Sequence, residues 1–117
     1  TQLVGLLSQA PSREAKRAVG RLAGHVMVLR HMSHSVAGML DRGENPMLQA
    51  TIVKDLGALF EQEIPDIART LAVDAGSPDS TFAAVLARTL LVAPSFSLRG
   101  GTREILRSII ARGLGLR

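Results

Sequence analysis

One long stretch of regularly spaced apolar residues most constrains what this chain can fold into. It begins after Pro11 and Ser12, runs to Gly43, and has alternating spacings of four and three residues. Its positions are Ala15, Val19, Leu22, Val26, Leu29, Ser33, Val36 and Leu40. This spacing predicts one helix of about 30 residues, or about 45 Å at 1.5 Å per residue. Because such a helix presents one apolar seam, it needs a partner of similar length, as in an antiparallel bundle.

The residues that follow the turn "DRGENP" predict that partner. Asn45 and Pro46 provide an N-cap and a proline at the first helical position, and Gly76 marks the end. The expected inward positions are Leu48, Ile52, Leu56, Leu59, Ile64, Ile67 and Leu71. Pro65 removes one backbone donor, so we expect a kink near "EQEIPD" and no end of the helix there.

Two shorter helices complete the pattern. Asp79 or Ser80 can cap a helix that reaches about Val92, and "APSFSLRGG" connects it to the last helix. That helix is expected to begin after Thr102 and to end at Gly113, as a glycine just past the last helical residue.

The pattern therefore predicts an all-α fold. We expect an up-and-down four-helix bundle in a single domain over residues 1–117, with an extra N-terminal helical remnant packed alongside. The remnant "TQLVGLLSQ" begins without methionine and reads as the end of a helix, so we expect the chain to be a fragment of a longer one.

Composition excludes several classes of protein. The chain has no cysteine, which excludes disulfides and thiolate zinc sites. Its net charge is +4, but it has no tyrosine or tryptophan to stack on bases, so we expect no nucleic-acid partner. It has neither a long uncharged apolar window nor a charged segment leading into an apolar one. We therefore expect no membrane span, no signal peptide and a cytoplasmic location.

The side chains offer little chemistry of their own. His25, His31 and His34 lie on one predicted helix at spacings that prevent three ligands from converging, so we expect no metal site. The acidic run Glu61, Glu63 and Asp66 has two interpretations, an acid–base group or a solvated helix face. No catalytic residue is predicted.

The closing segment "LRGGTREILRSIIARGLGLR" is the most distinctive stretch. Two glycines precede Thr102, and Glu104 lies in the first turn of an amphipathic helix. Paired glycines permit positive φ and close approach by another body. The segment is thus either a capped helix after a glycine hinge or a ligand contact.

This segment resembles the C-terminal signature of the acyl-CoA dehydrogenases, in which Gly-Thr-x-Glu/Gln-Ile opens the last helix of a bundle. "VLRHMSHSVAGMLDRGENP" and "TIVKDLGALFEQEIPDIARTLAVDAG" resemble the preceding helices. The resemblance implies an oxidoreductase of fatty acid metabolism that desaturates an acyl-CoA, with FAD bound partly across a subunit interface. It implies FAD contacts by Thr102 and Glu104, with Gly101 and Arg103 beside them. It also implies a homo-oligomer, or a hetero-oligomer with a related subunit.

The chain departs from the family at two places. Many members have Gln-x-x-Gly-Gly where this chain has Val73, Gly76 and Ser77. Many also carry the glutamate base where Gly100 stands, and glycine cannot accept a proton. Two arrangements stay open. The base comes from an earlier helix outside this segment, or the chain is a non-catalytic helical assembly subunit paired with an active partner.

Overall fold

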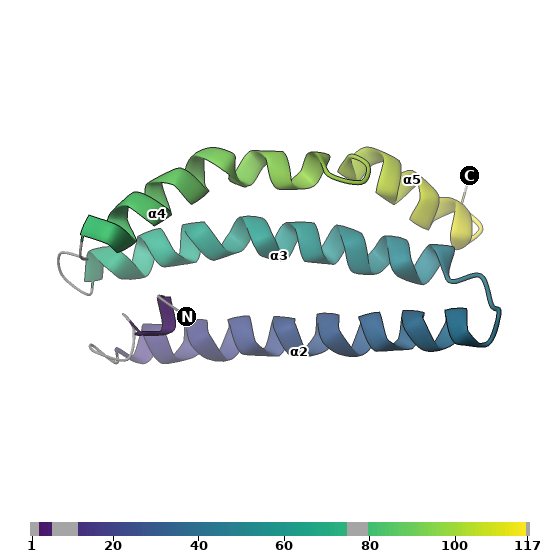
Figure 1. Ribbon diagram of the computed structural model, residues 1–117, viewed down its shortest axis with the longest axis horizontal. Coiled ribbons are helices and arrows are strands. Elements are labelled where there is room, and N and C mark those ends of the chain that lie inside the picture. Colours follow the sequence, from purple (N-terminus) through teal and green to yellow (C-terminus); the bar gives the residue numbers. More distant parts are fainter. Residues whose placement is uncertain (1–2, 6–11, 75–79, 117) are drawn as a thin grey trace.

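The structure, a computed structural model, describes residues 3–5, 12–74 and 80–116 (Figure 1). Its elements are α2 (Arg13–Asp41), α3 (Met47–Asp74), α4 (Ser80–Val92), a 3₁₀ helix η1 (Ala93–Leu98) and α5 (Arg103–Gly113). Residues 3–5 are also helical, and the described ranges contain no strand. The predicted all-α helical bundle is therefore confirmed.

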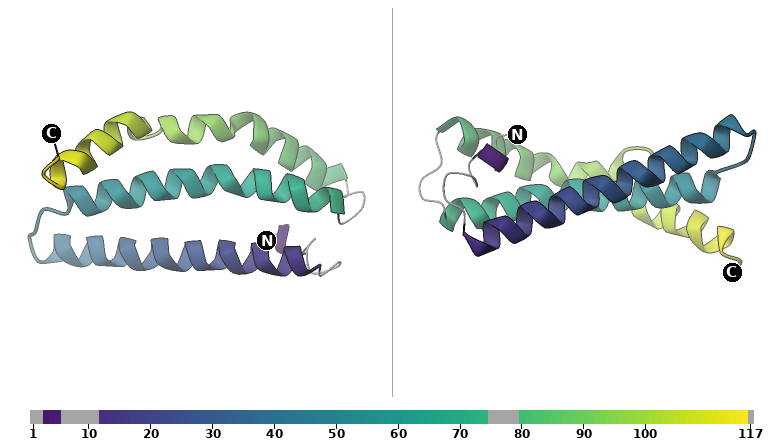
Figure 2. Two further views of the ribbon diagram at one scale, coloured as in Figure 1. Left: turned by 180° about the vertical axis from the view of Figure 1, so that it is seen from behind. Right: turned by 90° about the horizontal axis from the view of Figure 1, so that it is seen from below.

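The helix α3 lies in the middle of the bundle. α2 packs along one flank of α3, whereas α4, η1 and α5 follow one another along the opposite flank (Figures 1 and 2). The four α-helices thus form three long rods, and the molecule measures 50 × 25 × 23 Å. This arrangement gives α3 two covered faces, and α2 only one.

Caps confirm both predicted ends of the first long helix and the predicted start of the second, whereas the predicted end at Gly76 lies outside the described residues. Ser12 Oγ accepts a hydrogen bond from the Ala15 N–H at 3.0 Å at the start of α2. Gly43, at φ +72°, follows the end of α2 and takes part in the paired backbone hydrogen bonds of a Schellman motif. Asn45 Oδ1 accepts from the Met47 N–H at 3.1 Å, which caps the start of α3.

The predicted absence of a helix end at Pro65 is also confirmed. α3 continues through Pro65 to Asp74, although the proline supplies no backbone donor. Pro65 is fully buried. It lies one turn before Ala68, which forms a buried cluster with Phe82 of α4.

The predicted seam of α2 is correct at five of its eight positions, and Val26, Ser33 and Leu40 are exposed. Val26 and Leu40 are 52% and 59% exposed, and the Ser33 hydroxyl donates back to the Leu29 carbonyl. Positions one residue earlier replace them: the His25 ring meets Phe60 of α3, and Met32 and Met39 are half-buried. On a helix, both the third and the fourth residue after a seam position are its neighbours, so spacing alone does not show which one faces the partner.

The seam predicted for α3 needs a similar correction, because Leu56 is 42% exposed. Leu71, at the end of the predicted seam, is buried as expected. The other buried positions of α3 belong to a second face of small and polar residues: Thr51, Asp55, Ala58, Pro65 and Ala68. A search for large apolar residues passes over such a face. It binds the third rod, as shown by the hydrogen bond from Gln62 Nε2 to the Ala93 carbonyl at 3.2 Å.

The two buried clusters lie toward the open end of the α2–α3 hairpin. Ala15 packs with Leu71, and Ala68 packs with Phe82. Leu3 packs against both clusters, so residues 3–5, the described part of the N-terminal remnant, lie beside them.

The connection "APSFSLRGG" begins with the 3₁₀ helix η1. The end of the last helix differs from expectation. Gly113 is the last residue of α5, and the glycine past the end is Gly115, at φ +78°. The amides of Gly115 and Leu116 complete a Schellman motif there.

Gly113 is required for another reason, its contact with α3. A Cβ atom at this position would lie 2.9 Å from Leu48 Cδ1. We expect Gly113→Ala to lower the free energy of unfolding by about 1–2 kcal/mol, because either α5 or Leu48 must move. Gly24→Ala is the control, because a Cβ on this α2 glycine meets nothing within 4 Å. It should raise the free energy of unfolding by up to about 1 kcal/mol. Urea titrations that gave both variants the same sign would contradict this packing.

Within the described residues, the segment Thr81–Leu98 is long and apolar enough to cross a membrane, with a mean hydropathy of 1.5 and 11% of it buried. α4 ends inside it at Val92, and the chain continues as η1 through Pro94. Both elements pack on α3. In this fold the segment is therefore part of the third rod, and the expectation of no membrane partner stays a prediction.

Candidate functional site

The turn before α5 is built on two glycines in the left-handed region. Gly100 has φ +74° and Gly101 has φ +107°. A side chain at either position would be strained, which explains the double glycine of the sequence. Thr102 follows with extended backbone angles, φ −71° and ψ 161°, and occupies the predicted N-cap position.

The turn lies close against the bundle on one side. A Cβ on Gly100 would be 3.4 Å from Cε of Lys54 on α3, and one on Gly101 would be 3.6 Å from Leu106 Cδ2. Leu106 is itself buried, at 6% exposed. The glycines therefore let the backbone pass close to Lys54 and Leu106, while Gly100 itself remains exposed to solvent.

Thr102 and Glu104 are brought together on the exposed side. The Thr102 side chain makes no cap hydrogen bond to the helix backbone. The pKa of Glu104 is lowered, first by a hydrogen bond from its own backbone N–H, then by one from the Thr102 hydroxyl, with Arg103 and Arg107 adding attraction. Glu104 is thus an ionised carboxylate at neutral pH, open to solvent and adjacent to a hydroxyl.

Arg103 lies apart from this pair. Its Nε is 3.5 Å from Oδ1 of Asp55 on α3, and the Arg107 Nε is 3.8 Å from the other oxygen of the same carboxylate. Arg103 is a neighbour of the predicted contact residues in sequence, but its side chain is used to join α5 to α3. Sequence reasoning missed Asp55. Asp55 is an acid on the small-residue face of α3, and that face becomes evident only from the packing of the third rod.

The acidic run on α3 does not form an acid–base group. Its carboxylates pair with three different arginines: Glu63 with Arg21 at 3.0 Å, Glu61 with Arg99 at 3.8 Å, and Asp66 with Arg69 at 3.8 Å. All three are partly or largely exposed. These three acids therefore form a solvated helix face, the second of the two interpretations made from the sequence. No group of three or more possible metal ligands occurs in the part of the chain that the structure describes.

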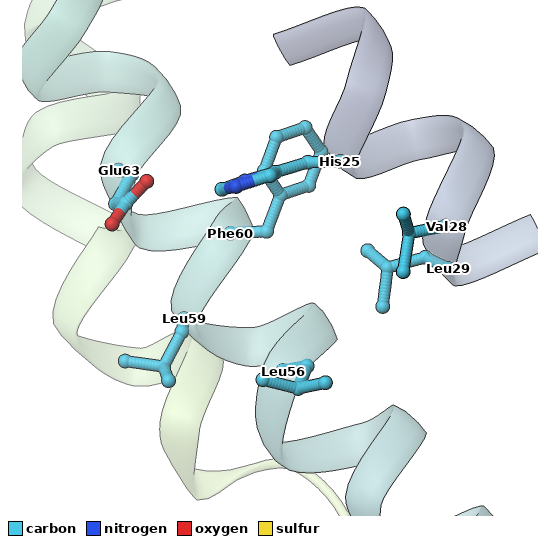
Figure 3. Close-up of a pocket in the computed structure, with 7 residues that line it drawn as sticks. All are labelled: His25, Val28, Leu29, Leu56, Leu59, Phe60 and Glu63. Carbon is cyan, nitrogen blue, oxygen red and sulfur yellow. The ribbon is translucent and has the colours of Figure 1, made fainter. Parts of the chain in front are cut away.

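An apolar hollow of about 340 Å³ lies between α2 and α3 (Figure 3). Side chains from both helices point toward it, and the His25 ring stands nearly edge-on to Phe60, with centroids 5.3 Å apart. Its lining residues are His25, Val28, Leu29, Leu56, Leu59, Phe60 and Glu63. None of the predicted cofactor contacts lies in this hollow.

The chain matches a known protein family over most of its length. Residues 10–115 match the family described as "Acyl-CoA dehydrogenase, C-terminal domain", an oxidoreductase family that is generally FAD-dependent. Neither the curated proteins nor the solved structures gave a match. Because the match covers nearly the whole chain, this protein belongs to the acyl-CoA dehydrogenase family, within its C-terminal domain.

Proposed function

We propose that this chain is the FAD-contacting and oligomerisation domain of an acyl-CoA dehydrogenase-like flavoprotein that desaturates an acyl-CoA thioester. The observation that carries the proposal is the turn of Gly100 to Glu104. It combines left-handed glycines, a helix start without a side-chain cap, and a half-buried threonine close to an exposed carboxylate.

The residues present fit a polar part of a flavin. The N–H groups in the first turn of α5 have no carbonyl partner within the helix, and those of Arg103 and Ile105 are donors for a polar or anionic group. The Thr102 hydroxyl is not used as a helix cap. The Glu104 carboxylate accepts from N–H and O–H donors, so it suits a donor edge of the cofactor better than a phosphate.

The turn's role is binding. When bound, FAD accepts the hydride that leaves the β carbon of the acyl-CoA. Thr102 and Glu104 would bind the cofactor. The glycines have no side chains, so the cofactor can approach the backbone closely. Arg103 holds the turn against α3 through Asp55.

The α proton goes to a carboxylate outside this turn. Gly100 stands at the position of the family's usual glutamate, and its φ of +74° fits glycine. The pKa of Glu104 is lowered by its own backbone N–H and by the Thr102 hydroxyl, which directs this carboxylate toward the helix start. The alternative function, a non-catalytic assembly subunit paired with an active partner, is favoured by the same glycine and by the apolar hollow between α2 and α3.

The test is a double variant in the complete protein. Thr102→Val with Glu104→Ala should weaken flavin binding by about tenfold or more, because two side-chain hydrogen-bonding groups are lost. The fold should be kept, since Thr102 makes no side-chain cap and Glu104 is exposed. Equilibrium dialysis with FAD measures the affinity, and the melting temperature checks the fold.

The same substitutions elsewhere provide the control. Thr70→Val with Glu14→Ala removes the same groups from exposed positions on α3 and α2. Equal flavin affinity in the two double variants would reject the turn as a flavin contact. A colourless complete protein, purified as an oligomer, would favour the assembly subunit.

A further inference from the structure

Asp55 is a carboxylate in the middle of α3 that the sequence does not mark as functional. It is 8% exposed and lies on the face that receives the third rod. Its two oxygens meet two arginines of α5, Arg103 at 3.5 Å and Arg107 at 3.8 Å. Residues four apart lie on the same side of a helix, so Asp55 can pair with both Arg103 and Arg107.

This contact is electrostatic more than it is a set of good hydrogen bonds. Asp55 Oδ1 and Arg103 Nε are buried and have no hydrogen-bond partner by strict geometry. A buried charge without a counter-charge is costly, so each group depends on the other. The Arg103 side chain is only 30% exposed, whereas that of Arg107 is 61% exposed. Arg103 is therefore the partner more dependent on Asp55.

The pair fixes the start of α5 and not its far end. Arg103 lies between Thr102 and Glu104, the two residues proposed to contact flavin. A helix turns about 100° per residue, so directing Arg103 toward α3 leaves Glu104 on a neighbouring, exposed side. Lys54, next to Asp55 on α3, approaches the position of Gly100. Two consecutive residues of α3 thus lie beside the turn, Lys54 near Gly100 and Asp55 at Arg103.

From this juxtaposition we propose that Asp55 is a positioning residue for the flavin-contact turn. It acts through Arg103, with Arg107 as the second partner, and does not itself contact the cofactor. The inference rests on the proposed function of the turn. Removing the charge of Asp55 is expected to loosen the turn and so to weaken the flavin contact made by Thr102 and Glu104.

The experiment compares Asp55→Asn with Asp55→Glu in the complete protein. Asn keeps the size of the side chain and removes the charge, whereas Glu keeps the charge. Asp55→Asn should speed hydrogen exchange at the amides of residues 103–107 and weaken FAD binding by about tenfold, the usual size of coupling through a shared element. Asp55→Glu should recover most of both losses. The visible circular dichroism of the bound flavin should change in Asp55→Asn and return in Asp55→Glu.

A destabilised variant far from the turn provides the matched control. Phe82→Ala removes a buried ring of α4 and lowers the melting temperature without touching α5. Its flavin affinity and flavin dichroism should equal those of the parent. If Phe82→Ala weakens flavin as much as Asp55→Asn for the same loss of melting temperature, Asp55 acts only through global stability and the proposal is overturned.

Two further outcomes separate this inference from the proposed function. Unchanged exchange at residues 103–107 in Asp55→Asn overturns the positioning role, and this measurement needs no flavin. Faster exchange with unchanged flavin affinity also overturns it, provided that Thr102→Val with Glu104→Ala weakens flavin. If that double variant leaves flavin binding unchanged, the proposed function of the turn fails, and the flavin role of Asp55 fails with it.

Discussion

Replacing Leu106 by aspartate is expected to lower the free energy of unfolding by about 3 kcal/mol or more, because it buries an unpaired carboxylate. Leu106 is 6% exposed and packs beneath Gly101. The nearby arginines of α5 are already shared with Asp55. Chemical denaturation followed by circular dichroism measures the loss.

Ile105→Asp is the matched control, because it places the same side chain in the same helical turn. Ile105 is 55% exposed, so its replacement buries no charge. Helix propensity and the attraction of an acid to the helix N-terminus are nearly equal at the two positions. We expect a change within about 0.5 kcal/mol. A similar loss in both variants would mean that Leu106 is not part of the core.

The second large effect is expected on assembly. Leu56→Asp places a charge in the apolar hollow between α2 and α3, which we propose another subunit covers. Burying that carboxylate at an interface should weaken association by about a hundredfold, since each 1.4 kcal/mol is a factor of ten. Because Leu56 is 42% exposed in the single chain, the fold should be largely kept. Light scattering should then show a smaller particle with unchanged helicity.

Gln49→Asp controls for the added charge alone. Gln49 is exposed on α3 and does not line the hollow. It should leave the oligomeric mass unchanged. An unchanged mass for Leu56→Asp as well would show that this hollow faces solvent in the assembled protein.

The sequence predicted helices better than it predicted their faces. Caps are local, so Ser12, Asn45 and Gly43 could be interpreted from a few neighbouring residues. The faces depend on which neighbour each helix meets, and spacing leaves adjacent positions such as His25 and Val26 nearly equivalent.

The candidate site could be located but not fully described from the sequence. The double glycine and Thr102 give local signals: both glycines have positive φ, and Thr102 occupies the N-cap position, although its side chain makes no cap hydrogen bond. The link from Arg103 to Asp55 joins residues nearly 50 positions apart, so no local pattern contains it. The departures at Val73, Gly76 and Ser77 are not settled, because Gly76 and Ser77 lie outside the described residues, as does the Val73 side chain.

The central place of α3 has a consequence for how the chain folds. α2 and α3 form one hairpin, and α3 with the rod of α4, η1 and α5 forms a second, so the main packing joins elements that follow each other in sequence. Such low contact order is typical of fast-folding helical proteins. Both hairpins share α3, so either hairpin can fold first. The helices of the other hairpin then pack onto an α3 that has already formed.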